Sequence, residues 1–138
     1  MRTWYSIIIF LGGLAPKASG DALAKLVASD AAEGDYFGGS VAVSGDLVVV
    51  GVSGDDHAGA YSGSAYVFRM TNASWTQVAK LVASDAATND EFGESVAISG
   101  DLVVVGAYGN DAAGLDSGSV YVFRTTNGGA SWTETAKL

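Results

Sequence analysis

The chain has 138 residues, and with 49% hydrophobic and 16% charged residues it is too apolar to be disordered. Its formal net charge of −8 is repelled by phosphate backbones, which makes nucleic acid an unfavourable partner. The absence of cysteine and the single histidine, His57, exclude disulfide frameworks, thiolate zinc sites and multi-histidine metal sites.

Residues 1–20 contain, in order, the three regions typical of a secretory signal peptide. Arg2 gives a positive start, residues 4–15 form an apolar run, and residues 18–20 are a small-residue cleavage pattern. The run is too short to span a bilayer, so we expect a secreted or cell-surface protein with no membrane span in the mature chain. Because the run is rich in aromatic and β-branched residues, a buried first strand is the alternative.

An internal repeat organises the rest of the chain, residues 21–138. Residues 25–69 align without a gap to residues 80–124, and 33 of the 45 positions are identical. The offset is 55 residues, so the two repeat units are about 25–79 and 80–136.

Within each unit the hydrophobic pattern has the period of β-strands, and no stretch has a helical pattern. The predicted strands are 22–28, then 40–44, 47–51, 64–69 and 75–83, and the second unit repeats this order and ends in 119–124 and 132–138. Gly45-Asp46 supplies the positive φ that a tight hairpin needs, and Gly100-Asp101 repeats it. Each unit is therefore predicted to be a four-stranded antiparallel meander, preceded by one extra N-terminal strand.

A unit of this length with four short strands is typical of a β-propeller blade. Phe37-Gly38 followed by SVAVSGDLVVVGV, and Phe92-Gly93 followed by SVAISGDLVVVGA, resemble the FG-GAP repeat in the β-propeller of integrin α-subunits. The resemblance implies an all-β fold of propeller blades and an adhesion-like surface scaffold that binds protein or glycan. Two blades do not close a propeller, so we expect the chain to be part of a longer propeller, with a homo-oligomer as the alternative.

Many integrin-type repeats carry a calcium loop of the form DxDxDG between the first two strands of a blade. Here that connection holds only Asp46 or Asp101, so the family's calcium site is not carried over. Acidic residues gather in other loops instead, and the weak candidates for a metal are Asp35, Asp55, Asp56, Asp90, Asp111 and Asp116. We interpret them as turn formers at the blade edges, so no cofactor is expected, and calcium binding is the alternative.

The aromatic residues are interpreted mainly as core. Phe37 and Phe92 enter the first strand of each blade beside a glycine that allows close backbone approach. Trp75 and Trp132 open the fourth strands and are the best candidates if a glycan site exists. The turn that precedes Trp132 resembles the Asp-box of sialidase-type propellers, a motif that stabilises a hairpin. Asn72 begins an N-glycosylation sequon in the turn between the third and fourth strands.

No catalytic constellation emerges from the sequence. His57 is replaced by Ala112 in the second repeat, no pair of acids stands out from the repeated loop acids, and there is no phosphate-binding loop. We therefore expect a non-enzyme. The alternatives to a binding scaffold are an accessory module of a secreted hydrolase and a structural repeat with no ligand of its own.

Overall fold

The computed structural model of the protein describes residues 24–138. The predicted signal peptide, residues 1–20, lies outside the described residues. The strands are β1 (Ser40–Ser44), β2 (Leu47–Val52), β3 (Ser64–Thr71), β4 (Ser74–Leu81), β5 (Ser95–Ser99), β6 (Leu102–Ala107), β7 (Ser119–Arg124) and β8 (Thr133–Lys137). Residues 24–138 hold no helix that is long and apolar enough to cross a membrane.

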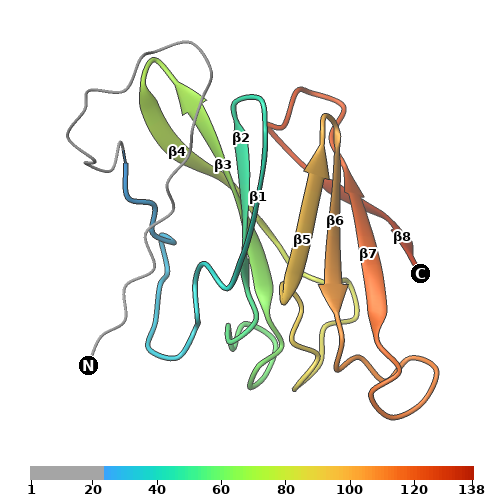
Figure 1. Ribbon diagram of the computed structural model, residues 1–138. Helices are drawn as coiled ribbons and strands as arrows, with labels where there is room; N and C mark the ends of the chain where they lie inside the picture. Colours follow the sequence, from blue (N-terminus) through green and yellow to red (C-terminus); the bar gives the residue numbers. More distant parts are fainter. Residues whose placement is uncertain (1–23) are drawn as a thin grey trace.

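The eight strands form two antiparallel sheets that stand face to face (Figure 1). The strand order is β1-β2-β3-β4 in the first sheet and β5-β6-β7-β8 in the second, so each sheet is a meander within one repeat. The predicted all-β fold of two four-stranded blades is confirmed. We call the sheets blade 1 and blade 2.

The turn between the first two strands of each blade shows how the local sequence determines a hairpin. Ser44 pairs with Leu47 across a two-residue turn in which Gly45 has a φ of 59°. The same turn in blade 2 places Gly100 at 56°. A side chain at this first turn position would be strained, so glycine allows the strands to reverse in two residues.

The main core lies between the blades. Val49 and Val67 from blade 1 face Val103, Val105 and Phe92 from blade 2, and all five side chains are fully buried. Phe92 contacts the ring of Tyr121 at a centroid distance of 5.4 Å and that of Phe123 at 6.0 Å. Each sheet thus buries one face against the other, as expected for neighbouring blades.

The outer face of blade 1 has its own core, in which Val48, Val50 and Tyr66 are buried. Leu26, Ala28 and Phe37 pack against it from the segment that precedes β1. Residues 24–28, the described part of the predicted strand 22–28, are not a strand, which corrects that prediction. The equivalent residues Lys80 and Leu81 pair with β3 of the preceding blade, and the described residues offer 24–28 no such neighbour.

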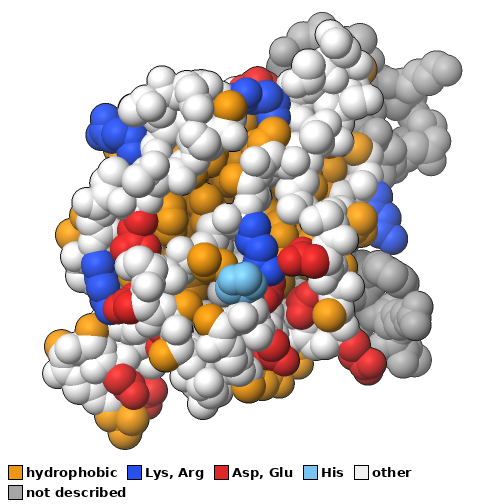
Figure 2. Space-filling model, turned by 180° about the vertical axis from the view of Figure 1, so that it is seen from behind, with side chains coloured by type: hydrophobic (Ala, Val, Ile, Leu, Met, Phe, Trp, Pro, Cys, Tyr) orange, Lys and Arg blue, Asp and Glu red, His pale blue; other side chains and the backbone are white. Residues whose placement is uncertain are grey.

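Connecting loops leave the strands at the end drawn lowest in Figure 1, where β2 joins β3 and β6 joins β7. We call this end the loop end. Figure 2 shows acidic side chains spread over the lower half of the opposite view, around the single histidine. On that face, acidic side chains are therefore more numerous toward the loop end.

Candidate functional site

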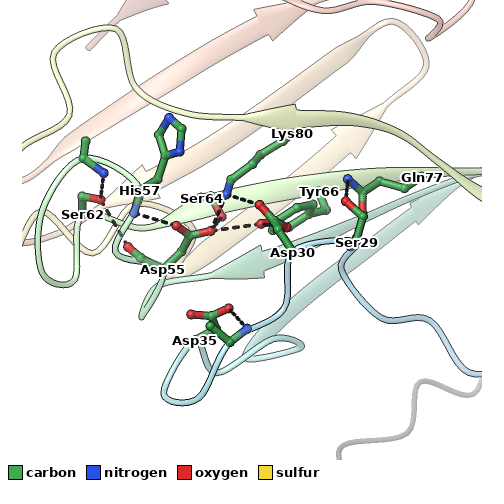
Figure 3. Close-up of polar contacts among 12 residues, drawn as sticks. Ser29, Asp30, Asp35, Asp55, His57, Ser62, Ser64, Tyr66, Gln77 and Lys80 are labelled. Atoms are coloured by element: carbon green, nitrogen blue, oxygen red, sulfur yellow. Dashed lines mark hydrogen bonds and ion pairs between the residues drawn. The ribbon is translucent and has the colours of Figure 1, made fainter.

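The most connected polar cluster lies in blade 1 and joins β3, β4 and two loops (Figure 3). The Tyr66 hydroxyl donates to Asp30 Oδ1 at 2.7 Å. Lys80 Nζ lies 2.7 Å from both Asp30 Oδ2 and Asp55 Oδ2. Asp55 Oδ2 also accepts from Ser64 Oγ at 2.8 Å. The cluster therefore ties the segment before β1 and the loop after β2 to the middle of the blade.

These contacts determine the charge of each group. Burial tends to raise the pKa of Asp55, but hydrogen bonds from Lys80, Ser64 and Tyr66 outweigh it and leave this pKa below its ordinary value. The hydrogen bond from Lys80 lowers the pKa of Asp30. Burial tends to lower the pKa of Lys80, and the hydrogen bonds to the two carboxylates raise it instead. Burial raises the pKa of Tyr66 to about 12. Lys80 is thus held protonated between two carboxylates.

Blade 2 repeats the cluster with one change. Tyr121 donates to Asp85 Oδ1 at 2.7 Å, and Lys137 pairs with the same carboxylate. Asn110 occupies the position of Asp55, and its Nδ2 donates to Asp90 Oδ2 at 3.0 Å. The second cluster therefore lacks the buried carboxylate of the first, although its tyrosine and lysine are placed in the same way.

Four of the other acidic metal candidates, Asp35, Asp56, Asp90 and Asp111, accept hydrogen bonds from the backbone of their own loops. Asp35 Oδ2 accepts from Ala32 N at 2.7 Å, and Asp90 Oδ2 accepts from Ala87 N at 2.9 Å in the equivalent turn. In the loop after β2, Asp56 Oδ1 accepts from Tyr61 N at 2.8 Å. In the loop after β6, Asp111 Oδ1 accepts from Asp116 N at 2.6 Å. Burial raises the pKa of Asp35. Within residues 24–138, no three His, Cys, Asp or Glu side chains are grouped so that they could hold a metal ion.

The connection that carries calcium in integrin-type repeats holds one carboxylate in each blade, Asp46 or Asp101. Asp46 Oδ2 lies 3.4 Å from Arg69 Nε, and Asp101 Oδ2 lies 3.2 Å from Arg124 Nη1. A single carboxylate already paired with an arginine does not provide the six or more oxygens that calcium requires. Calcium therefore does not fit at this connection.

The tryptophan candidates are half-buried rather than exposed. Trp75 packs against the outer core of blade 1, and Trp132 packs against the core between the blades. In the turn before Trp132, Asn127 Oδ1 accepts from Ser131 N at 3.0 Å, and Gly129 N donates to Thr125 Oγ1 at 2.8 Å. These bonds stabilise a hairpin, which is the role that the Asp-box resemblance implies.

Asn72 and Ala73 form the exposed turn between β3 and β4, with φ values of 51° and 63°. A glycan on Asn72 would project into solvent from this turn. The position is thus accessible to modification.

A group of two exposed tyrosines and one half-buried glutamate at the loop end was not predicted. The Tyr61 and Tyr108 side chains are 44% and 57% exposed, and the half-buried Glu91 contacts both residues. Glu91 N donates to Tyr61 O at 2.9 Å, and a side-chain hydrogen bond with Glu91 raises the pKa of Tyr108. We call Tyr61, Glu91 and Tyr108 the tyrosine surface. A sequence signal does exist, because all three lie at positions where the two repeats differ.

Comparison with protein families identifies the FG-GAP repeat in this chain. Residues 21–68 and 75–123 each match the model of the FG-GAP repeat, and together they cover more than half of the chain. No curated protein matches the chain. The first matched range holds β1, β2 and most of β3, and the second holds most of β4 together with β5, β6 and most of β7.

Proposed function

This chain belongs to the FG-GAP repeat family, and from that membership we propose that its two β-propeller blades form a non-catalytic binding module, outside the cell or at its surface. FG-GAP repeats are typical of extracellular and cell-surface proteins. The ligand is a protein or a glycan, and it contacts the loop end.

The exposed tyrosine surface is the observation that carries this proposal. Tyrosine offers a large apolar ring and a hydroxyl at low entropic cost, so it is enriched where proteins contact ligands. Here Tyr61 and Glu91 have φ values of 55° and 52°, and a backbone hydrogen bond joins them across the two blades. The surface is thus held in place before a ligand arrives, which reduces the entropy lost on binding.

The charge around the tyrosine surface narrows the class of ligand. Asp56, Asp111 and Asp116 are exposed in the neighbouring loops, and the whole chain carries a net charge of −8. An anionic ligand would be repelled at low ionic strength. The expected ligand is therefore a neutral glycan or a protein with a basic surface.

The polar clusters support a non-catalytic role. A lysine held protonated by two carboxylates is a poor nucleophile, and carboxylates hydrogen-bonded to that lysine are poor bases. His57 is exposed in a loop and its repeat equivalent is Ala112. The clusters instead stabilise each blade through polar contacts between its strands and loops.

The test is binding of the full chain to a glycan array and to a panel of extracellular basic proteins. The double variant Tyr61→Ser and Tyr108→Ser is expected to lose at least roughly tenfold in affinity for any ligand found, because tyrosine anchors often dominate such interfaces. Thr126→Ser, in the exposed turn between β7 and β8, is the control and should bind normally. Calcium or a chelator should leave the affinity unchanged.

Full binding by the tyrosine double variant would contradict the proposed surface. Hydrolysis of an arrayed glycan by the purified chain would contradict the non-catalytic role. Binding that disappears with a chelator and returns with calcium would show that the acidic loops hold the ion.

A further inference from the structure

Blade 2 has an open groove on the face turned away from blade 1. The groove has a volume of about 430 Å³, and Ser95, Gly106, Gly118 and Ser119 are among its lining residues. In blade 1 the repeat-equivalent residues are Ser40, Gly51, Gly63 and Ser64, one repeat length of 55 residues earlier. The two grooves therefore have the same four residues at the same places.

In blade 1 this groove is filled by the segment Asn89–Gly93, which leads into β5. Its backbone hydrogen bonds run from Asn89 N to Ala60 O (2.8 Å), from Glu91 N to Tyr61 O (2.9 Å) and from Phe92 N to Ser62 O (3.2 Å). Ser40 Oγ also donates to Gly93 O at 2.7 Å. The segment thus lies along the edge of the loop after β2, where Phe92 forms an isolated parallel bridge with Gly63.

The glycines of blade 1 are required by this fit. A Cβ on Gly51 would lie 1.9 Å from Gly93 O, and a Cβ on Gly63 would lie 2.0 Å from Phe92 O. In blade 2, the three atoms nearest to a Cβ on Gly106 all belong to Ser95, and a Cβ on Gly118 would find its nearest atom, Tyr108 O, at 3.4 Å. Among the described residues nothing occupies the groove of blade 2.

The apolar floor beside each groove shows the same contrast. Leu47, Val49 and Val67 of blade 1 are between 0% and 6% exposed because blade 2 covers them. Their equivalents Leu102, Val104 and Val122 are only half-buried. Blade 2 therefore presents the same contact face as blade 1, without its cover.

The chain also carries a segment of the shape that fills such a groove. Gly34–Gly38 is the equivalent of Asn89–Gly93, and it already has the same backbone, with Tyr36 at a φ of 57° and Gly38 at 93°. The corresponding values for Glu91 and Gly93 are 52° and 97°. Tyr36 is 61% exposed, and the neighbouring β1 residues Val41 and Val43 are 47% and 51% exposed.

We propose that the groove and apolar face of blade 2 bind blade 1 of a second copy of this chain, whose Gly34–Gly38 segment enters the groove as Asn89–Gly93 enters that of blade 1. Backbone N–H groups of the incoming segment bond to carbonyl groups of the loop after β6, and Ser95 Oγ donates to Gly38 O. Val41 and Val43 of the incoming copy cover Val104 and Val122.

A second copy is the occupant because one chain contains both halves of this contact, and because the contact repeats an interface already formed between its own blades. The two surfaces differ, so the interaction is head-to-tail rather than two-fold symmetric. It leaves one free surface at each end of a pair. Further copies therefore add until the ring closes, or they continue as an open array.

The test is the molar mass of the full chain by light scattering and sedimentation over a wide range of concentration. The wild type is expected to exceed the single-chain mass of 14.0 kDa as concentration rises. Val122→Asp places a charge on the blade 2 face, and Val43→Asp places one on the blade 1 face. Each should weaken assembly by roughly a hundredfold, because the carboxylate would be buried without a partner.

The decisive measurement is a mixture of the two variants. Each variant alone keeps one intact surface, so an equimolar mixture should form a pair of chains and no larger species. Thr76→Asp is the matched control, because Thr76 stays exposed although blade 2 covers the neighbouring face, and it should assemble like the wild type. Circular dichroism and thermal melting confirm that each variant is folded. Val122→Ala, which adds no charge, should weaken assembly less.

A wild type that stays at the single-chain mass at every concentration would overturn the proposal. So would folded variants that assemble like the wild type, or a variant mixture that forms no pair. A mass that reaches a plateau indicates a closed ring and a mass that keeps growing indicates an open array, and both support the head-to-tail contact.

Discussion

Lys80 and Lys137 occupy the same position in the two blades, yet only Lys80 pairs with a buried carboxylate. The Asp55 side chain is 8% exposed, whereas Asp85, the partner of Lys137, is 49% exposed. Lys80→Met would leave Asp55 charged and buried without its cation, and we expect a loss of about 3 kcal/mol in the free energy of unfolding at neutral pH. Chemical denaturation at neutral pH measures this loss.

Lys137→Met is the matched control for that substitution. Its carboxylate partner remains in contact with water, so the expected loss is under about 1 kcal/mol. Equal losses in the two variants would show that burial of Asp55 does not determine the strength of its pair.

The cost of Lys80→Met should also depend on pH. In the wild type the pKa of Asp55 lies below its ordinary value of 3.8, so Asp55 contributes stability at higher pH, and this contribution is lost as the pH falls through the lowered value. Without Lys80 the pKa of Asp55 is higher than in the wild type, because burial still raises it and one of the hydrogen bonds that lower it is lost. The difference between wild type and variant should therefore be largest near neutral pH and shrink below about pH 4. Denaturation midpoints across this range test it, and a constant difference would contradict it.

At the scale of elements, the fit between blades depends on the absence of side chains at defined strand positions. Gly51 lies in β2 against the backbone of Gly93, and its equivalent in β6, Gly106, meets no other blade within residues 24–138. Gly51→Ala must push the blades apart and should cost about 2 kcal/mol or more. Gly106→Ala has only the Ser95 side chain to displace and should change stability by less than about 1 kcal/mol.

Thermal melting of both glycine variants at low protein concentration measures this difference. A low concentration keeps single chains apart, so that only the contact between the blades of one chain is compared. If the two variants melted at the same temperature, the close approach of Gly51 and Gly93 would not contribute to stability.

Hairpins were the elements that could be predicted most fully from the sequence. The strands 40–44 and 119–124 have the predicted bounds. The alternation of side chains along both strands and the Gly45-Asp46 turn that follows the first are local signals in the sequence. The segment 22–28 has the same composition as a fourth strand, but its described part is not a strand. A strand depends on a neighbour for its hydrogen bonds, and no local pattern reports whether that neighbour is present.

The candidate sites were harder to predict, since they depend on contacts between distant residues. Lys80 hydrogen-bonds to Asp30, which lies 50 positions earlier in the sequence, and Asn89 N hydrogen-bonds to Ala60 O of the other blade. The sequence predicted that the acidic residues lie in loops, but it could not show which backbone groups they contact. Tyr61 and Tyr108 could have been found from the differences between the repeats, because shared positions mainly serve the common fold.

At the scale of the whole molecule, the shared core predicts that the two blades unfold together. Phe92 and Val105 of blade 2 share one core with Val49 and Val67 of blade 1, and all four are fully buried, so loss of either blade exposes part of the core of the other. Repeat arrays unfold cooperatively when the interface between repeats dominates their stability, as the size of this core implies.

Two tryptophans report on the two blades separately. One variant keeps only Trp75 and the other keeps only Trp132, with the remaining tryptophans replaced by phenylalanine. The fluorescence of each should change at the same denaturant concentration, and both changes should coincide with the loss of β-sheet circular dichroism. Because each substitution shifts stability slightly, fluorescence and circular dichroism are compared within each variant. Fluorescence of Trp132 that changed before the circular dichroism was lost would show that blade 2 opens alone, and that the core between the blades is weaker than its burial implies.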